Sequence, residues 1–274
     1  MTIDRVGWRN FAAEVSSNEQ NIDLAKASLY YAQAEYPNLD VADYLEYLDR
    51  LAVDIADNLP QERYPLQVIK TINSYLFDRL DFQGDSQDYY NPENSYLNKV
   101  IDRGLGIPIT LSVVYLAIAQ RINFPMVGIG MPGHFLIRPD FANAGIFVDA
   151  FNQGEILFEQ DCEAKLSQLY QQPVKLEPHW LNPVNNHQIL ARMLNNLKQI
   201  YLHHRQLEKV LAVVKGILML FPHNPYEIRD RGLLYYEMAR WHDATDDLKF
   251  YLETLPDAED APMIEMLLQK IANL

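Results

Sequence analysis

The stretch that decides the fold contains residues 130–136, GMPGHFL, and residues 147–149, FVD. A histidine opens one short apolar segment and an aspartate closes the next. Short apolar runs bounded by Gly, Pro, Asn or Asp are typical of β-strands. A histidine beside a carboxylate is the arrangement of a general base and the group that orients it. We therefore predict that His134 and Asp149 lie on adjacent strands and are joined by a hydrogen bond.

The segment upstream of this pair predicts a buried helix. Residues 104–112 read GLGIPITLS, and Pro108 suits a first helical position, where its missing N–H needs no partner. The chain from Pro108 to about residue 122 is apolar nearly all round, which is typical of a helix in the centre of a domain. Three short apolar runs then predict strands, at residues 125–131, 134–138 and 145–151.

The N-terminal part predicts a layer of helices over residues 5–80. Apolar residues recur there at helical spacing, and Asp40 and Pro65 fit helix starts. A core over residues 90–170 completes a first domain that we expect to end at residue 181. The fold class is then α+β and predominantly helical, with helices followed by a small antiparallel sheet.

Residues 182–274 contain an internal repeat. At an offset of 34 residues Tyr201 matches Tyr235 and Pro222 matches Pro256, and this offset is the tetratricopeptide (TPR) period. The repeat predicts a second, helical domain with two helix pairs and a terminal cap. The expected helices are 187–203, 206–220, 225–240, 242–255 and 260–273.

Four motifs carry a resemblance to a known family. They are YNPENSYLN at residues 90–98, GIPITLS at 106–112, PGHFL at 132–136 and DAF at 149–151. With these motifs, residues 20–170 resemble the SirB-type branch of the transglutaminase-like superfamily, which often carries C-terminal TPR repeats. The resemblance implies a cysteine-protease-type domain in which His134 and Asp149 match the catalytic histidine and aspartate. It also implies that the nucleophilic cysteine belongs at or near Pro108.

Proline is no nucleophile, so other side chains are weighed for that role. Thr110 and Ser112 lie near a helix N-terminus, whose partial charge favours a developing anion, but helical Ser and Thr commonly bond their own backbone. Cys162 lies in the acidic run EQDCE, residues 159–163, and neighbouring carboxylates disfavour the thiolate. A structural role is favoured for each of the three.

Candidate binding residues fall into two groups. Tyr90, Asn94 and Asn98 belong to the aromatic, Asn-rich segment that we expect near His134. The second group lies on the first helices of the repeats, whose concave surface is the usual binding face of TPR proteins, and would meet a partner's carboxylates. Its members are Arg192, Asn195, Asn196, Arg229 and Arg231. The alternative is that this face packs against the first domain.

Composition excludes several classes of function. The net charge of -14 argues against nucleic acid as a partner. A single cysteine excludes a disulfide framework and a Cys-based zinc site, and no histidine–carboxylate cluster has metal-ligand spacing, so neither metal nor cofactor is predicted. The first residues lack a signal pattern and no apolar run could span a bilayer. We expect a cytoplasmic protein without membrane insertion.

These features favour a non-enzymatic scaffold that binds a protein or peptide through the His134 site or the TPR surface. Such a protein is a pseudoenzyme, because the nucleophilic cysteine is absent. The alternative is an amide hydrolase or acyl-transferase that uses His134, Asp149 and a non-standard nucleophile, namely Cys162, Ser112 or Thr110.

Overall fold

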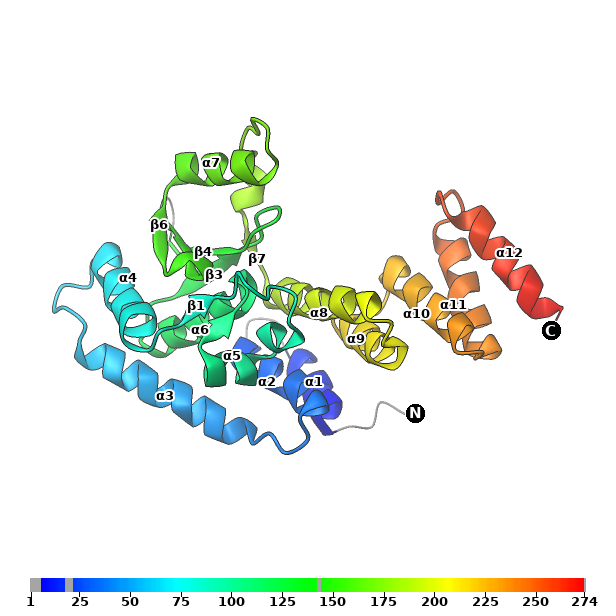
Figure 1. The fold of residues 1–274 in the computed structure, drawn as a ribbon, viewed down its shortest axis with the longest axis horizontal. Helices are drawn as coiled ribbons and strands as arrows, with labels where there is room; N and C mark the ends of the chain where they lie inside the picture. The colour runs from blue at the N-terminus through cyan, green and yellow to red at the C-terminus, as the bar shows by residue number, and fades with distance from the viewer. Residues whose placement is uncertain (1–5, 18–21, 142–143, 274) are drawn as a thin grey trace. The chain divides into compact units, whose positions relative to one another are not determined.

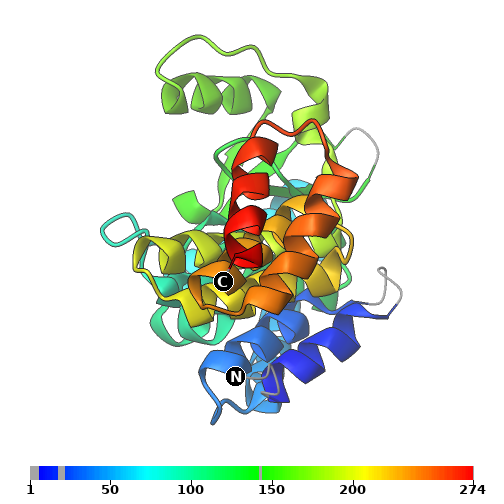
Figure 2. The same cartoon turned by 90° about the vertical axis from the view of Figure 1, so that its right-hand side faces the viewer.

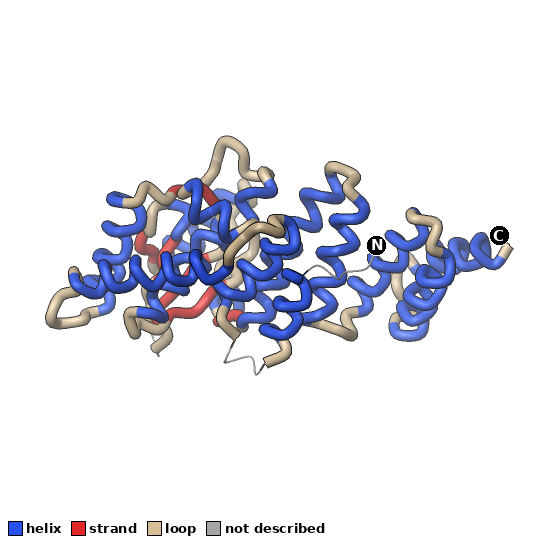
Figure 3. Tube along the Cα trace, turned by 90° about the horizontal axis from the view of Figure 1, so that it is seen from below, coloured by secondary structure: helices blue, strands red, loops and turns tan. Residues whose placement is uncertain are grey.

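The computed structural model describes residues 6–17, 22–141 and 144–273. The chain divides into two compact units after Met193. In the described part of the chain all strands, drawn red in Figure 3, belong to the first unit, whereas the second unit is helical. The predicted α+β domain followed by a helical region is confirmed.

Helices make up most of the first unit. They are α1 (Val6–Val15), α2 (Leu24–Glu35), α3 (Val41–Asp57), α4 (Pro65–Asn73), α5 (Leu97–Arg103), α6 (Pro108–Arg121) and α7 (Glu159–Leu169). A π-helical turn, η2 (Ser74–Arg79), extends α4, and short 3-10 turns form η3 (Pro92–Ser95), η4 (Ala150–Asn152) and η5 (Pro178–Leu181).

The predicted helix starts are confirmed. Asp40 caps α3 by accepting a hydrogen bond from the backbone N–H of Ala42 at 2.9 Å. Pro65 and Pro108 each occupy the first position of a helix. Every residue from Pro108 to Ala119 is buried, as the uniformly apolar sequence of α6 predicts.

A five-stranded antiparallel sheet lies beside α6, in the order β6-β5-β4-β3-β7. Its strands are β3 (Met126–Ile129), β4 (Leu136–Pro139), β5 (Phe147–Asp149), β6 (Glu155–Leu157) and β7 (Pro183–Val184). The three predicted strands correspond to β3, β4 and β5. The sequence analysis missed β6 and β7, because strands of three and two residues are too short to show an apolar alternation. A separate parallel pair joins β1 (Gln83–Gly84) to β2 (Leu105–Gly106).

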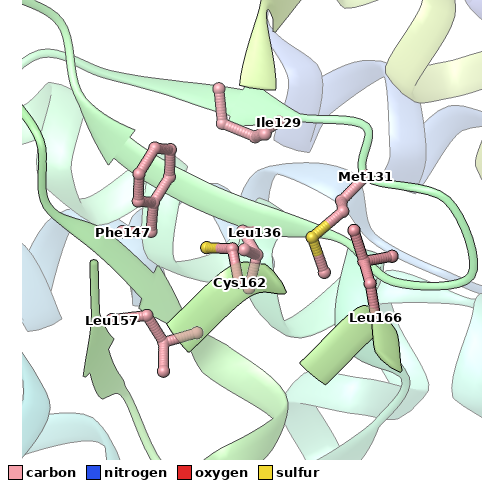
Figure 4. Packing of buried hydrophobic residues seen from close by; sticks show 7 residues of the cluster. All are labelled: Ile129, Met131, Leu136, Phe147, Leu157, Cys162 and Leu166. Carbon is pink, nitrogen blue, oxygen red and sulfur yellow. The ribbon is translucent and has the colours of Figure 1, made fainter. Parts of the chain in front are cut away.

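The sheet is covered on both faces, by α6 on one side and α7 on the other (Figures 1 and 2). On the α7 side, strand residues Ile129, Leu136 and Phe147 pack with Cys162 and Leu166 of α7 (Figure 4). Because alternate residues of a strand point to opposite faces, Ile137 and Val148 point to the α6 side. Asp149 lies two residues after Phe147 on β5 and therefore points to the same side of the sheet, toward α7.

The repeat region matches its predicted helices closely. Its helices are α8 (Asn186–His203), which begins in the first unit, α9 (Leu207–Leu220), α10 (Pro225–Glu237), α11 (Trp241–Thr254) and α12 (Ala261–Ala272). A Cβ atom at Gly232 would lie 2.9 Å from the Leu248 side chain, so glycine permits α10 and α11 to approach closely. None of the described helices combines the length and apolar character that a membrane span requires.

The division between the units lies inside α8, beyond the boundary expected at residue 181. The first part of α8 packs on the first unit. Asn186 donates to the Ile22 carbonyl at 3.1 Å, and the Arg192 guanidinium donates to the His134 carbonyl at 2.7 Å. These contacts assign the start of the helix to the first unit.

Candidate functional site

The site is built around His134, which lies in a turn immediately before β4. Gly133 has a φ of 70°, a left-handed conformation that favours glycine, and the His134 N–H donates to the Met131 carbonyl at 3.1 Å. The turn presents the imidazole toward Asp149, the last residue of β5. His134 Nε2 lies 2.8 Å from Asp149 Oδ2, so the predicted hydrogen bond is present, although His134 precedes its strand.

Asp149 is fully buried and both of its oxygens are saturated. Oδ1 accepts from the backbone N–H groups of Phe151 at 3.1 Å and Asn152 at 3.3 Å. Oδ2 accepts from His134, from the Asn152 side chain at 2.7 Å and from Lys165 Nζ at 3.1 Å. Burial alone raises the pKa of Asp149, but the bonds and charges of His134, Asn152 and Lys165 outweigh it and lower the pKa to about 2.

The sequence analysis missed Asn152 and Lys165. Asn152 follows the aspartate by three residues, and an asparagine in the turn after a strand end was the available signal. Lys165 comes from α7, and the sequence holds no sign of it because only the packing of α7 on the sheet brings Lys165 to Asp149.

The orientation of His134 leaves its second ring nitrogen available. An ionised carboxylate accepts from Nε2–H, so Nδ1 carries the lone pair of the neutral ring. None of the described residues forms a hydrogen bond with Nδ1, and the side chain is 18% exposed. An imidazole held in this way is able to accept a proton or to bind a ligand.

Two of the proposed nucleophiles belong to α6, and both are buried. Thr110 Oγ1 donates to the Asn94 carbonyl at 2.8 Å and accepts from the Ile107 N–H at 3.1 Å, so it caps the helix. Ser112 Oγ is buried and has no hydrogen-bond partner among the described residues. Neither hydroxyl is bonded to His134.

The third proposed nucleophile, Cys162, lies in the apolar cluster between α7 and the sheet (Figure 4). Its side chain is fully buried. Burial, together with the charges of Asp161 and Glu159, raises the pKa of the thiol to about 12. A thiol with this pKa, enclosed by core side chains, does not suit the nucleophilic role considered for Cys162.

Aromatic side chains surround the imidazole. The Phe151 ring meets His134 edge-on, with centroids 6.5 Å apart, and its other neighbour is Tyr89 at 6.1 Å. A Cβ atom at Gly84 would lie 2.5 Å from this ring, so Phe151 also packs against β1. Phe151 therefore contacts both the imidazole and the strand pair that leads into α6.

Of the loop residues proposed for binding, Tyr90 is exposed and the two asparagines are not. Tyr90 packs on Tyr89 with centroids 5.3 Å apart and is 73% exposed. Asn94 is fully buried, donating to Asp85 at 3.0 Å and accepting from Arg103 at 3.1 Å, and Asn98 is buried on α5. Neither asparagine side chain reaches the surface, so their burial does not favour the ligand-contacting role considered for them.

Comparison with known proteins decides the family. Residues 42–195 match the transglutaminase-like superfamily and residues 197–269 match the tetratricopeptide repeat. A UPF0162 protein of Xylella fastidiosa (strain Temecula1) is 32% identical, over 97% of this chain and 95% of the relative. Protein SirB1 of Salmonella typhimurium (strain LT2) is 28% identical and UPF0162 protein YchA of Escherichia coli (strain K12) 29% identical, each over 87% of this chain and 88% of the relative.

The chain belongs to the UPF0162/SirB1 family of transglutaminase-like proteins. No solved structure matches it. The resemblance drawn from the four motifs is therefore confirmed, and with it the order of a transglutaminase-like domain followed by TPR helices.

In this UPF0162 chain, the basic residues proposed for the TPR surface already have partners. Arg229 bonds Asp230 at 2.7 Å and Asp260 at 2.8 Å, and Arg231 bonds Asp247 at 2.7 Å through two nitrogens. Carboxylates of the same chain neutralise both charges. The sequence had led us to expect that these arginines would bind the carboxylates of a partner. Asn195 and Asn196 are half-buried on α8.

Arg192 differs from these arginines because it belongs to the His134 site. Its guanidinium donates to the carbonyls of His134 at 2.7 Å and Met131 at 3.4 Å and lies over the Phe135 ring, 5.5 Å from its centroid. The described residues contain no cluster of three His, Cys, Asp or Glu side chains that would hold a metal ion.

Proposed function

We propose that this UPF0162 chain is a non-enzymatic scaffold that binds a peptide segment of a partner protein around His134. One observation carries the proposal: the imidazole is oriented by Asp149 and partly exposed, yet no hydroxyl or thiol of the described residues is bonded to it. Acyl transfer through a covalent intermediate needs a nucleophile within hydrogen-bond reach of the base. The oriented imidazole is present without that group.

The surroundings of His134 suit a peptide. Leu169 of α7 packs against Gly133, where an added Cβ would lie 2.1 Å from its side chain, and Leu169 is 52% exposed. Tyr89 and Tyr90 are exposed, and the Tyr89 ring contacts the Phe151 ring, which in turn contacts the imidazole. Exposed aromatic and aliphatic side chains beside fixed polar groups are characteristic of protein-interaction surfaces. The TPR match of residues 197–269 supports protein binding as well.

A second candidate is hydrolysis of an amide or ester with water as the nucleophile. The ordered dyad favours it, because the free Nδ1 is able to accept a proton from water. In this candidate, water takes the place of the protein nucleophile that the sequence led us to consider. Thr110, Ser112 and Cys162 are all unsuited to that role because they are buried.

Two measurements on the intact chain separate these functions. The scaffold predicts no turnover of p-nitrophenyl acetate, and no labelling by fluorophosphonate or iodoacetamide, above a His134→Ala control. It also predicts that labelled peptides bind the wild type and lose affinity in His134→Ala and Tyr90→Ala. Turnover that disappears in His134→Ala would establish the hydrolase, and equal peptide binding by both variants would rule out the His134 surface.

A further inference from the structure

Arg192 is a half-buried cation with no counter-ion. In the described part of the chain no carboxylate lies within ion-pair distance of its guanidinium, although acidic residues outnumber basic ones by 37 to 23. Burial lowers the pKa of Arg192, because a desolvated charge is costly. An unpaired charge in such a place favours an anion that compensates it.

Hydrogen bonds hold the Arg192 guanidinium in place but do not involve all of its N–H groups. Of the five N–H groups of an arginine, Arg192 donates three to the carbonyls of Met131 and His134. The Phe135 ring supports the plane of the guanidinium. Two N–H groups therefore remain for a ligand, on a side chain whose position is already fixed.

Two other polar groups lie next to this cation. His134 supplies the carbonyl that Arg192 binds, and its ring leaves Nδ1 unbonded. Tyr89 is 39% exposed and close enough for the charge of Arg192 to oppose the rise that burial causes in the pKa of the phenol. The guanidinium and the phenol offer donors that a carboxylate accepts, whereas Nδ1 of His134 is an acceptor and suits a backbone N–H of the same ligand.

We propose that Arg192 and Tyr89 bind the C-terminal carboxylate of a peptide beside His134. This inference rests on the proposed function and names the part of the peptide that the site recognises. One guanidinium matches one negative charge, and the net charge of -14 disfavours ligands with several. The exposed rings of Tyr89 and Tyr90 would pack against the last side chains of such a peptide.

The test uses the intact chain and a library of labelled, acetylated tetrapeptides made in two forms, with a free C-terminal carboxylate and with a carboxamide. We expect the free-acid forms to bind about tenfold more tightly, the effect of one charge-assisted bond. Arg192→Gln should remove that difference, Arg192→Lys should keep part of it, and Tyr89→Phe should reduce it severalfold. The matched control is Arg240→Gln, because Arg240 also lies over an aromatic ring but is paired with Asp243.

The outcomes are distinguishable. Equal binding of acids and amides by the wild type overturns the carboxylate site and leaves the scaffold standing, whereas no binding of either form overturns both. Acetate or inorganic phosphate that competes as well as the peptides assigns the site to a free anion and overturns the peptide terminus. Circular dichroism checks that each variant is folded. If Arg192→Gln is unfolded, Arg192→Lys and Tyr89→Phe decide, and an unchanged acid-to-amide ratio in both overturns the proposal.

Discussion

At the scale of single residues, Asp149 is an anion held by five hydrogen bonds and ion pairs from His134, Phe151, Asn152 and Lys165. Such saturation fixes the carboxylate, which in turn fixes the imidazole. The pair is therefore rigid whether or not it performs chemistry. Rigidity of this kind suits a recognition site, because the ordering of the side chains is complete before the ligand arrives.

The low pKa of Asp149 predicts an acid-dependent loss of stability. The pKa falls from its usual 3.8 to about 2 in the folded chain, so the unfolded state binds the proton more readily. The stabilisation is complete above pH 5 and is lost as the pH falls toward 2, by about 2 kcal/mol in all and about 1 kcal/mol by pH 3. Urea unfolding at pH 5 and pH 3 should show this loss in the wild type and a loss smaller by about 1 kcal/mol in Asp149→Asn. Equal losses in the two proteins would contradict it.

Cys162 predicts a thiol that is unreactive in the folded chain. Burial and the acidic neighbours raise its pKa to about 12, so little thiolate forms at pH 8. Iodoacetamide should label Cys162 at least about a hundredfold faster in unfolding concentrations of urea than in buffer. The control is Gln160→Cys in a Cys162→Ala background, whose thiol lies on the exposed side of α7 and should react in buffer. Fast labelling of native Cys162 would show that α7 does not hold this thiol against the sheet.

At the scale of elements, hydrogen bonds of the Thr110 hydroxyl fix the start of α6, whereas the Ser112 hydroxyl forms none with the described residues. Thr110 joins α6 to η3 through the Asn94 carbonyl and closes the helix N-terminus through the Ile107 N–H. Ser112, two residues later, bonds to none of the described residues. The two hydroxyls are equally buried, so they form a natural comparison.

We expect Thr110→Val to destabilise the first unit by about 2 kcal/mol, because it leaves a buried N–H and a buried carbonyl without their partner. Ser112→Ala should change the free energy of unfolding by less than about 1 kcal/mol, since it removes an unsatisfied oxygen. Urea unfolding followed by circular dichroism measures both variants. A cost for Ser112→Ala as large as that for Thr110→Val would mean that this hydroxyl has a partner in solution.

At the scale of the whole molecule, both units combine apolar packing with buried ion pairs, which in the first unit include the pair of Asp149 and Lys165. The first unit encloses its sheet between α6 and α7 with apolar side chains on both faces. The second unit adds buried ion pairs between its helices. Lys198 of α8 contacts Glu227 at 2.7 Å and Asp230 at 2.7 Å on α10, and both Lys198 and Glu227 are buried.

Lys198→Met should therefore destabilise α8 and α10 by about 3–5 kcal/mol, because it leaves the buried Glu227 carboxylate without a counter-ion, whereas Asp230 keeps Arg229. A second change, Glu227→Leu, should restore part of this loss by removing that carboxylate. Hydrogen exchange of the α8 and α10 amides measures the effect locally. Arg240→Gln, which breaks an exposed pair, is the control and should cost less than about 1 kcal/mol. If Lys198→Met destabilises the chain no more than this control does, the buried network contributes little to stability.

The sequence by itself determined the N-terminal helices, α6, the central strands and the repeat, but not α7. Helical spacing, Pro108 at a helix start and the offset of 34 residues are local patterns, and each reports the environment of its own segment. The contact between His134 and Asp149 was also predictable. His134 lies at the start of one predicted strand and Asp149 at the end of the next, and antiparallel pairing brings these two ends together.

Only the tertiary structure decided which side chains are available for function. By residue type, Asn94, Cys162 and Arg229 are candidates for a functional site. In the structure, burial or an internal partner makes each of these side chains unavailable to a ligand. Lys165 and Arg192 join the His134 site because distant helices carry them there. Burial and charge pairing depend on contacts between segments far apart in the chain, and such contacts leave no periodicity in the sequence of either segment.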